Sequence, residues 1–193
     1  SGAWPDQPRY YNGLTPLCTL ALLHAGCDEQ TPALASAMKW LRKFVPFSTY
    51  TASLQTMVFC ACDPERDRAR IVRNVAWIEG RQHQDGKERG MWATASAGSS
   101  DHTDNSMCHV AILALHEAER QGVAVSPRVW TKAEQHWRDT QNEDGSWGWG
   151  PGYPGSGSMT CAGVAALTLA ADAIGAADYV VAGDRIIGCR LPE

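Results

Sequence analysis

Apolar residues follow two different helical patterns along the chain. Nearly every position is apolar in four segments, residues 17–25, 54–61, 107–115 and 161–174. Such segments are typical of helices that are buried on all sides. Three other segments carry apolar residues on one face and charged residues on the other, residues 34–44, 68–82 and 127–141. Because the two patterns alternate, we predict an inner row of buried helices and an outer row of amphipathic helices.

Short sequence signals mark the expected ends of these helices. A capping residue joined to proline is typical of a helix start and occurs at Thr15-Pro16, Thr31-Pro32, Asp63-Pro64 and Ser126-Pro127. A glycine after an apolar run is typical of a helix end and occurs at Gly26, Gly122 and Gly175. Residues 179–183 form the one short strand candidate. We therefore expect one all-α domain over residues 1–193, built from about four helical hairpins.

Two stretches of the chain resemble each other. Residues 82–86 read Gln-His-Gln-Asp-Gly and residues 141–145 read Gln-Asn-Glu-Asp-Gly, each at the end of an amphipathic helix and each followed by tryptophan. Asp-Gly favours a tight turn, the glutamine amide can bond the free backbone groups at a helix end, and tryptophan supplies a large apolar surface. We expect a structural unit formed by Gln82, Asp85, Gly86 and Trp92, and a second formed by Gln141, Asp144, Gly145 and Trp147. The starts of three apolar helices also align, with Cys18, Cys108 and Cys161 in register.

Gln-x-x-Asp-Gly-x-Trp after an outer helix resembles the QW motif of the squalene–hopene and oxidosqualene cyclases. It is shared with the prenyltransferase/squalene-oxidase repeat proteins, and the chain is similar in particular to bacterial members of that group over about residues 15–175. The resemblance implies an α/α toroid whose inner helices line a central cavity. Since a closed toroid has about six hairpins, we expect a partial ring, a homodimer or part of a larger toroid. Gly2-Ala3-Trp4 resembles the tail of a preceding QW motif.

Composition excludes some functions. The 193-residue chain carries a net charge of −4, which disfavours nucleic acid and anionic membranes as partners. No apolar run is long enough to span a bilayer, and no secretory signal opens the chain. Seven cysteines without a Cys-x-x-Cys pair fit neither a disulfide framework nor a zinc ribbon, which favours reduced thiols and a cytoplasmic location.

The chain lacks the catalytic aspartic acid motif of the cyclases that it resembles. Those enzymes protonate their substrate with the middle Asp of Asp-x-Asp-Asp, and the nearest stretch, residues 101–106, contains only Asp101 and Asp104. Asp104 is the first catalytic candidate because the start of an inner helix would face the mouth of a toroid cavity. The alternative is that Asp104 simply caps the following helix.

A zinc site is the second chemical possibility at this place, although no cofactor is expected. Protein prenyltransferases hold zinc with Asp-x-Cys and a histidine, and Asp-x-Cys is absent here. Asp104, Cys108 and His109 remain weak candidates, because positions four apart can share a helix face whereas adjacent positions point about 100° apart. His109 is also a candidate catalytic group.

Residues 26–31 contain the spacing of a different chemistry. Gly-Cys-x-Glu-Gln resembles the thioester sequence of the complement and α2-macroglobulin domains, in which a cysteine thiol bonds a glutamine side chain. Cys27 and Gln30 have that spacing. The alternative is a plain turn between two helices, ended by Thr31-Pro32.

The loop over residues 145–158 carries aromatic residues among many glycines and prolines. Trp147, Trp149 and Tyr153 are candidates for binding an apolar ligand, or else pack on the rim of the fold. Three hypotheses remain. The chain is a non-catalytic module that binds an apolar, isoprenoid-like ligand or a protein; a diverged cyclase- or transferase-like enzyme; or a thioester protein.

Overall fold

The structure is a computed structural model of the chain, and it describes residues 2–5, 12–93, 103–175, 180–182 and 185–187. Seven helices lie in the described part: α1 (Leu14–His24), α2 (Pro32–Leu41), α3 (Thr49–Cys62), α4 (Pro64–Glu79), α5 (Asn105–Arg120), α6 (Pro127–Asp139) and α7 (Gly157–Ala173). Strands β1 (Val180–Ala182) and β2 (Arg185–Ile187) form a small antiparallel hairpin, and β1 falls on the expected strand candidate. The predicted all-α fold is confirmed.

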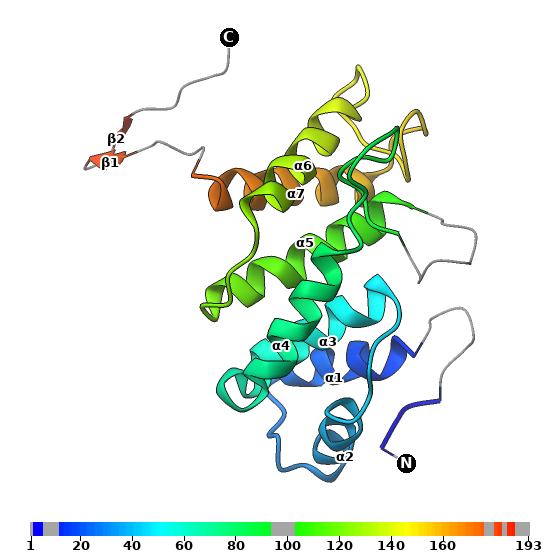
Figure 1. Cartoon of the computed structure of the whole chain (residues 1–193), viewed down its shortest axis with the longest axis vertical. Helices are drawn as coiled ribbons and strands as arrows, with labels where there is room; N and C mark the ends of the chain where they lie inside the picture. The colour runs from blue at the N-terminus through cyan, green and yellow to red at the C-terminus, as the bar shows by residue number, and fades with distance from the viewer. Residues whose placement is uncertain (1, 6–11, 94–102, 176–179, 183–184, 188–193) are drawn as a thin grey trace.

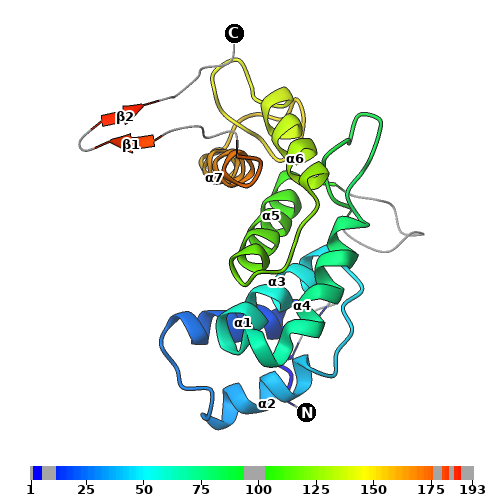
Figure 2. The same ribbon diagram turned by 60° about the vertical axis from the view of Figure 1, so that its left-hand side comes forward.

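The helices form two rows (Figures 1 and 2). In the inner row α1 packs on α3, α3 on α5 and α5 on α7, while α2 packs on α1, α4 on α3 and α5, and α6 on α7 from outside. The core between the rows is lined by large buried side chains, among them Phe59, Ile78, Trp92, Trp137 and Trp147. The alternation of inner and outer helices therefore agrees with the sequence pattern. Because α1 and α7 lie at opposite ends of the row, the described helices form an open array, and the toroid stays a prediction.

The two end helices of the inner row are more exposed than expected. Helix α3 buries ten of its residues, whereas α1 buries only Thr15, Pro16 and Thr19 and leaves Leu17 40% exposed. On α7, Val164 is 56% exposed. An apolar pattern all round the helix predicted complete burial, which is wrong for α1 and α7 because each has an inner neighbour on one side only.

The helix starts follow the predicted pairs at three of four places. Thr31, Asp63 and Ser126 are N-caps before a proline, but only the Asp63 side chain accepts a bond from a backbone amide, that of Arg66. Helix α1 begins at Leu14, so Thr15 lies inside the helix. There Thr15 Oγ1 accepts from the backbone amide of Trp4 at 3.0 Å. The three expected glycine ends are present, since Gly26, Gly122 and Gly175 all have positive φ.

None of the helices in the described part of the chain is both long and apolar enough to cross a bilayer.

Each of the two similar stretches builds the same hydrogen-bonded unit, which we name the Gln–Gly–Trp unit. In the second, Gln141 Nε2 donates to the Gly145 carbonyl at 2.9 Å, and Trp147 Nε1 donates to the Trp137 carbonyl at 2.8 Å. Trp137 lies four residues before Gln141, in the last turn of α6. The glutamine thus closes the loop and the tryptophan ties it to the preceding outer helix.

The first unit has the same bonds but a different glycine from the one the sequence suggested. Gln82 Nε2 donates to the carbonyl of Gly90 at 3.2 Å, and Trp92 Nε1 donates to the Ile78 carbonyl at 2.9 Å. Gly90 has φ +86°, beside +82° for Gly145, and each lies two residues before its tryptophan. Gly90, not Gly86, therefore occupies the place of Gly145, and the first loop is four residues longer.

Gly90 also makes a contact that Gly145 lacks. A Cβ on Gly90 would lie 2.2 Å from the Lys132 carbonyl oxygen, so the loop rests directly on the backbone of α6. Gly2, two residues before Trp4 and with φ +85°, rests in the same way on Ser36 of α2. A Cβ on Gly145 would meet only Gln141 Nε2, at 3.9 Å. In the two covered cases the glycine lets a loop touch the next outer helix.

The expected register of the three cysteines is wrong for Cys108. Cys18 lies five residues after Gly13, the N-cap of α1, as Cys161 lies five residues after the N-cap of α7, whereas Cys108 lies only four residues after the N-cap of α5. Asp104 and Ser156 are the N-caps of α5 and α7, and each side chain accepts from the amide three residues on. Counted from these caps, Cys108 corresponds to Thr160, and Cys161 corresponds to His109. Accordingly Cys108 is buried and Cys161 is exposed. The alignment matched the two cysteines because they are the same residue type, although they lie at different distances, four and five residues, from the N-caps of their helices.

Candidate functional site

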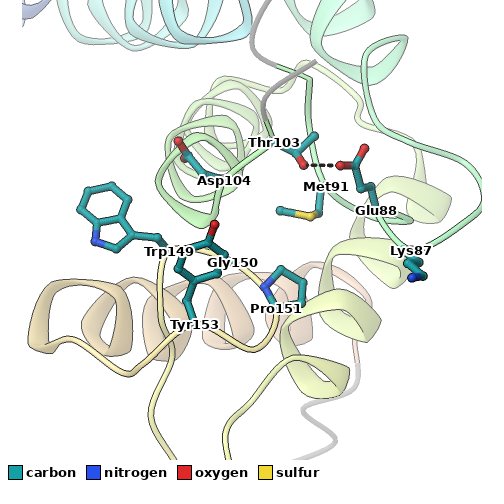
Figure 3. Close-up of a pocket in the computed structure, with 9 residues that line it drawn as sticks. All are labelled: Lys87, Glu88, Met91, Thr103, Asp104, Trp149, Gly150, Pro151 and Tyr153. Carbon is teal, nitrogen blue, oxygen red and sulfur yellow. Dashed lines mark hydrogen bonds between the residues drawn. The ribbon is translucent and has the colours of Figure 1, made fainter. Parts of the chain in front are cut away.

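A pocket of about 480 Å³ opens where the start of α5 meets two loops (Figure 3). It is lined by Lys87, Glu88, Met91, Thr103, Asp104, Trp149, Gly150, Pro151 and Tyr153. Trp149 and Asp104 lie on one side, Glu88 and Lys87 on the other, and Met91 extends between them. The structure thus brings Asp104, predicted as a catalytic candidate, together with Trp149 and Tyr153, predicted as aromatic ligand candidates.

The aromatic side of the pocket is a loop with a defined shape. The Tyr153 amide donates to the Gly150 carbonyl at 3.1 Å, with Pro151 and Gly152 between them. Gly152 has φ +76°, which matches a type II turn. A Cβ on Gly148 would lie 2.5 Å from the Tyr153 carbonyl oxygen, so only glycine lets the two arms of the loop approach. The loop holds Trp149 and Tyr153 in the open, 51% and 60% exposed.

Buried Asn105 fixes this loop to the helices. Its backbone amide donates to the Trp149 carbonyl and its Nδ2 to the Gly148 carbonyl, both at 2.9 Å. Its Oδ1 lies 2.9 Å from His136 Nε2 on α6. Burial lowers the pKa of His136 to about 4, against a smaller opposing effect of Asp139, so the neutral ring donates this bond near pH 7. Asn105 therefore joins α5, α6 and the aromatic loop.

Asp104 acts as a helix cap. Its Oδ1 accepts from the Met107 backbone amide at 2.8 Å and from Ser106 Oγ at 2.6 Å. Asp104 therefore caps the following helix, which was the alternative to a catalytic role. Its half-buried carboxylate also lines the pocket. Both bonds involve the same carboxylate oxygen, Oδ1.

The opposite wall is polar. Thr103 Oγ1 donates to Glu88 Oε1 at 2.9 Å (Figure 3). The other carboxylate oxygen of Glu88 is 3.6 Å from His83 Nε2, a pair that becomes ionic when the histidine is protonated. With Lys87 the wall offers one cation and one anion. The pocket as a whole combines apolar surface with two carboxylates, Glu88 and Asp104.

The metal candidates do not assemble. Cys108 is completely buried, and its burial raises the pKa of the thiol to about 12, against a smaller lowering by the backbone amide of Trp92. His109 is half-buried, and its pKa is lowered by burial. Among the described residues no three His, Cys, Asp or Glu side chains come close enough to hold a metal ion. Asp101, the remaining catalytic candidate, lies outside the described residues.

Trp147 is not part of the pocket. It is 2% exposed and packs edge-to-face on Trp137 with ring centroids 6.1 Å apart. Of the three aromatic ligand candidates, Trp149 and Tyr153 line the pocket, whereas Trp147 is part of the buried core.

Cys27 and Gln30 lie in the turn between α1 and α2. The backbone amide of Cys27 donates to the Leu22 carbonyl, and the backbone amide of Gln30 donates to Asp28 Oδ1 at 2.7 Å. The Thr31 hydroxyl bonds the Asp28 carbonyl. These local bonds are those of an ordinary helix–helix turn, in agreement with the alternative to thioester chemistry.

Several residues of the pocket have no signal in the sequence. Lys87, Glu88 and Met91 lie in the loop of the first Gln–Gly–Trp unit, which is four residues longer than the second, and Thr103 is the first described residue after residue 93. Asn105, which joins α5, α6 and the aromatic loop, is in the sequence only one of several polar residues at the start of a helix. Only the equivalence of Gly90 and Gly145, which follows from the hydrogen bonds of Gln82 and Gln141, shows that residues 86–89 are the extra residues of the first loop, and two of these, Lys87 and Glu88, line the pocket.

We expect Asp104→Ala to lower the free energy of unfolding by about 1 kcal/mol, the usual value of a helix cap. The reason is the loss of the bond to the Met107 amide. Urea unfolding measures the change, with Ser156→Ala as the matched control because Ser156 caps α7 in the same way. A loss several times larger for Asp104→Ala alone would contradict a simple capping role.

Comparison with known proteins gives no further assignment: no model of a protein family matches the chain, and neither does any curated protein.

Proposed function

We propose that this protein is a non-catalytic helical-repeat module of the α/α-toroid type that binds an apolar, isoprenoid-like molecule. The observation that carries the proposal is the pair Trp149 and Tyr153, both largely exposed on a loop held by buried Asn105. Two large aromatic side chains that remain in contact with water contribute little to the free energy of folding. Held in place before binding, they lower the entropy cost of binding an apolar ligand. Exposed Pro151 lies beside them in the pocket lining, and Met91, which is 1% exposed, lies at the pocket wall between the two sides.

The chemistry of the surrounding groups supports binding rather than catalysis. The Asp104 carboxylate is bonded as a cap, and Cys108 is buried as a neutral thiol. A diverged cyclase- or transferase-like enzyme would need a strong acid or a metal at this place. A protein partner that inserts an apolar side chain is the other occupant with the same chemistry.

Farnesol, an uncharged isoprenoid alcohol, is a suitable probe. We expect it to bind the wild-type chain, measured by calorimetry and by native mass spectrometry, and to bind Trp149→Ala/Tyr153→Ala at least about fivefold more weakly, since a lost aromatic contact is worth about 1 kcal/mol. Val164→Ala is the matched control, because Val164 is an exposed apolar residue on α7 outside the pocket.

Equal weakening by the control would show non-specific adsorption to apolar surface and would remove the proposal. Absence of farnesol binding by the wild type would leave the pocket without its proposed ligand class. Turnover of farnesol, or a mass change in it after incubation, would favour the enzyme hypothesis instead.

A further inference from the structure

A second pocket, of about 510 Å³, lies on the outer side of the molecule between α2 and α4. It is lined by Glu29, Gln30, Ala35, Lys39, Arg42, Lys43, Arg66 and Arg70. Five of these side chains are cationic and one is acidic, on a chain whose net charge is −4. Basic residues that gather against the overall charge of a protein create a local positive field.

A buried carboxylate organises the floor of this pocket. Asp67 has no exposed side-chain surface, and its two oxygens accept from Arg42 Nε at 3.2 and 3.0 Å. Asp67 Oδ1 also accepts from Arg70 Nη1 at 3.0 Å. Arg70 Nε donates to the Arg42 carbonyl at 3.1 Å, which joins the two arginines directly. Burial lowers the pKa of Arg42, but its bond to Asp67 and the charge of Asp67 outweigh that effect, and the pKa is raised.

Three further cations have no such partner. Lys39 lies in the last turn of α2 and Lys43 lies two residues beyond the end of that helix, while Arg66 lies one turn before Arg70 on α4. Across the described residues none of the three forms an ion pair, whereas Arg42 pairs with Asp67 and Glu29. The pocket therefore has a fixed pair of guanidinium groups beneath and three uncompensated charges around it.

We propose that this pocket between α2 and α4 binds a small phosphoryl-bearing anion of two or more negative charges. The planar guanidinium group of Arg66, which forms no ion pair among the described residues, matches the oxygen geometry of a phosphoryl group, and the ammonium groups of Lys39 and Lys43 add charge. A diphosphate with some of its hydration water fits the volume. A single carboxylate would leave two of the three free cations without a partner, so the charge favours a dianion or higher.

Isothermal titration calorimetry with inorganic phosphate and with inorganic diphosphate, at an ionic strength of about 0.05 M, tests the proposal. We expect diphosphate to bind more tightly than phosphate. Lys39→Gln, Lys43→Gln and Arg66→Gln should each weaken diphosphate binding about three- to tenfold, in line with the loss of one charge-assisted contact. All three residues are exposed, and none of them bonds Asp67, so we expect the variants to keep the fold.

Arg128→Gln is the matched control. Arg128 is an exposed arginine in the first turn of α6, as Arg66 is in the first turn of α4, and it lies away from the pocket. Its replacement should leave diphosphate affinity unchanged. Equal weakening by Arg128→Gln, or no heat of binding for the wild type with either anion, would overturn the proposal.

A phosphoryl group can be free in solution or belong to a lipid headgroup. Sedimentation with phosphatidylcholine vesicles containing phosphatidic acid separates the two sources, because only headgroup binding carries the protein into the pellet. Sedimentation that the Lys39→Gln/Arg66→Gln double variant abolishes would assign the pocket to a headgroup. Calorimetric binding without sedimentation would assign it to a free anion.

Discussion

Trp147→Ala is expected to lower the free energy of unfolding by about 3–5 kcal/mol, the usual cost of deleting a buried aromatic side chain. The ring is 2% exposed, its Nε1 bonds the Trp137 carbonyl, and it lies against Gly163 of α7. A Cβ on Gly163 would be 2.6 Å from the ring, so this glycine makes room for it. The substitution would leave a cavity between α6 and α7 and an unpaired carbonyl. Urea unfolding followed by circular dichroism measures the loss.

Trp149→Ala is the control for this experiment. Trp149 lies in the same loop but is 51% exposed, and we expect its removal to change stability by no more than about 0.5 kcal/mol. If both tryptophan variants unfold at the same urea concentration as the wild type, Trp147 does not join α6 to α7 energetically.

Gly90→Ala is expected to cost about 3–5 kcal/mol, which combines the strain of a positive φ with overpacking. The new methyl group would lie 2.2 Å from the Lys132 carbonyl oxygen and 2.9 Å from His136 Cβ. The first of these is helix backbone, which cannot rotate away, so the loop would have to leave α6. Thermal and urea unfolding both report the change.

Gly145→Ala isolates the packing part of that cost. Gly145 has nearly the same φ as Gly90 and the same place in its Gln–Gly–Trp unit, but no outer helix covers it. We expect a loss of only about 1–2 kcal/mol, from backbone strain alone. Equal losses at Gly90 and Gly145 would mean that the contact with α6 contributes nothing and that strain explains both.

The hydrophobic pattern was sufficient to predict the helices and their arrangement in two rows. A helix that is apolar all round must be covered, and an amphipathic helix next to it in the chain can cover it. The pattern failed at α1 and α7 because it does not reveal whether a helix has one neighbour or two. Val164 and Leu17 are as apolar as residues in α5, yet they are exposed.

The candidate site was predictable only in its separate parts. Exposed aromatics in a loop rich in glycine, and an acidic residue before an apolar helix, are visible in the sequence. Their meeting depends on Asn105 bonding the carbonyls of Gly148 and Trp149, a long-range contact that no local pattern encodes. In the same way, Asp-Gly at residues 85–86 looked equivalent to Asp-Gly at 144–145, because loop length is ambiguous until the hydrogen bonds of Gln82 are known.

The open row of inner helices has a consequence for how the molecule opens. Helices α3 and α5 each have an inner neighbour on both sides, whereas α1 and α7 have one. In such a linear array stability is close to a sum of nearest-neighbour terms, and cooperative units separate from the ends. Amide hydrogens of α7 and α1 would therefore exchange with solvent through partial unfolding that leaves the centre intact. Those of α3 and α5 would exchange only when the whole chain unfolds.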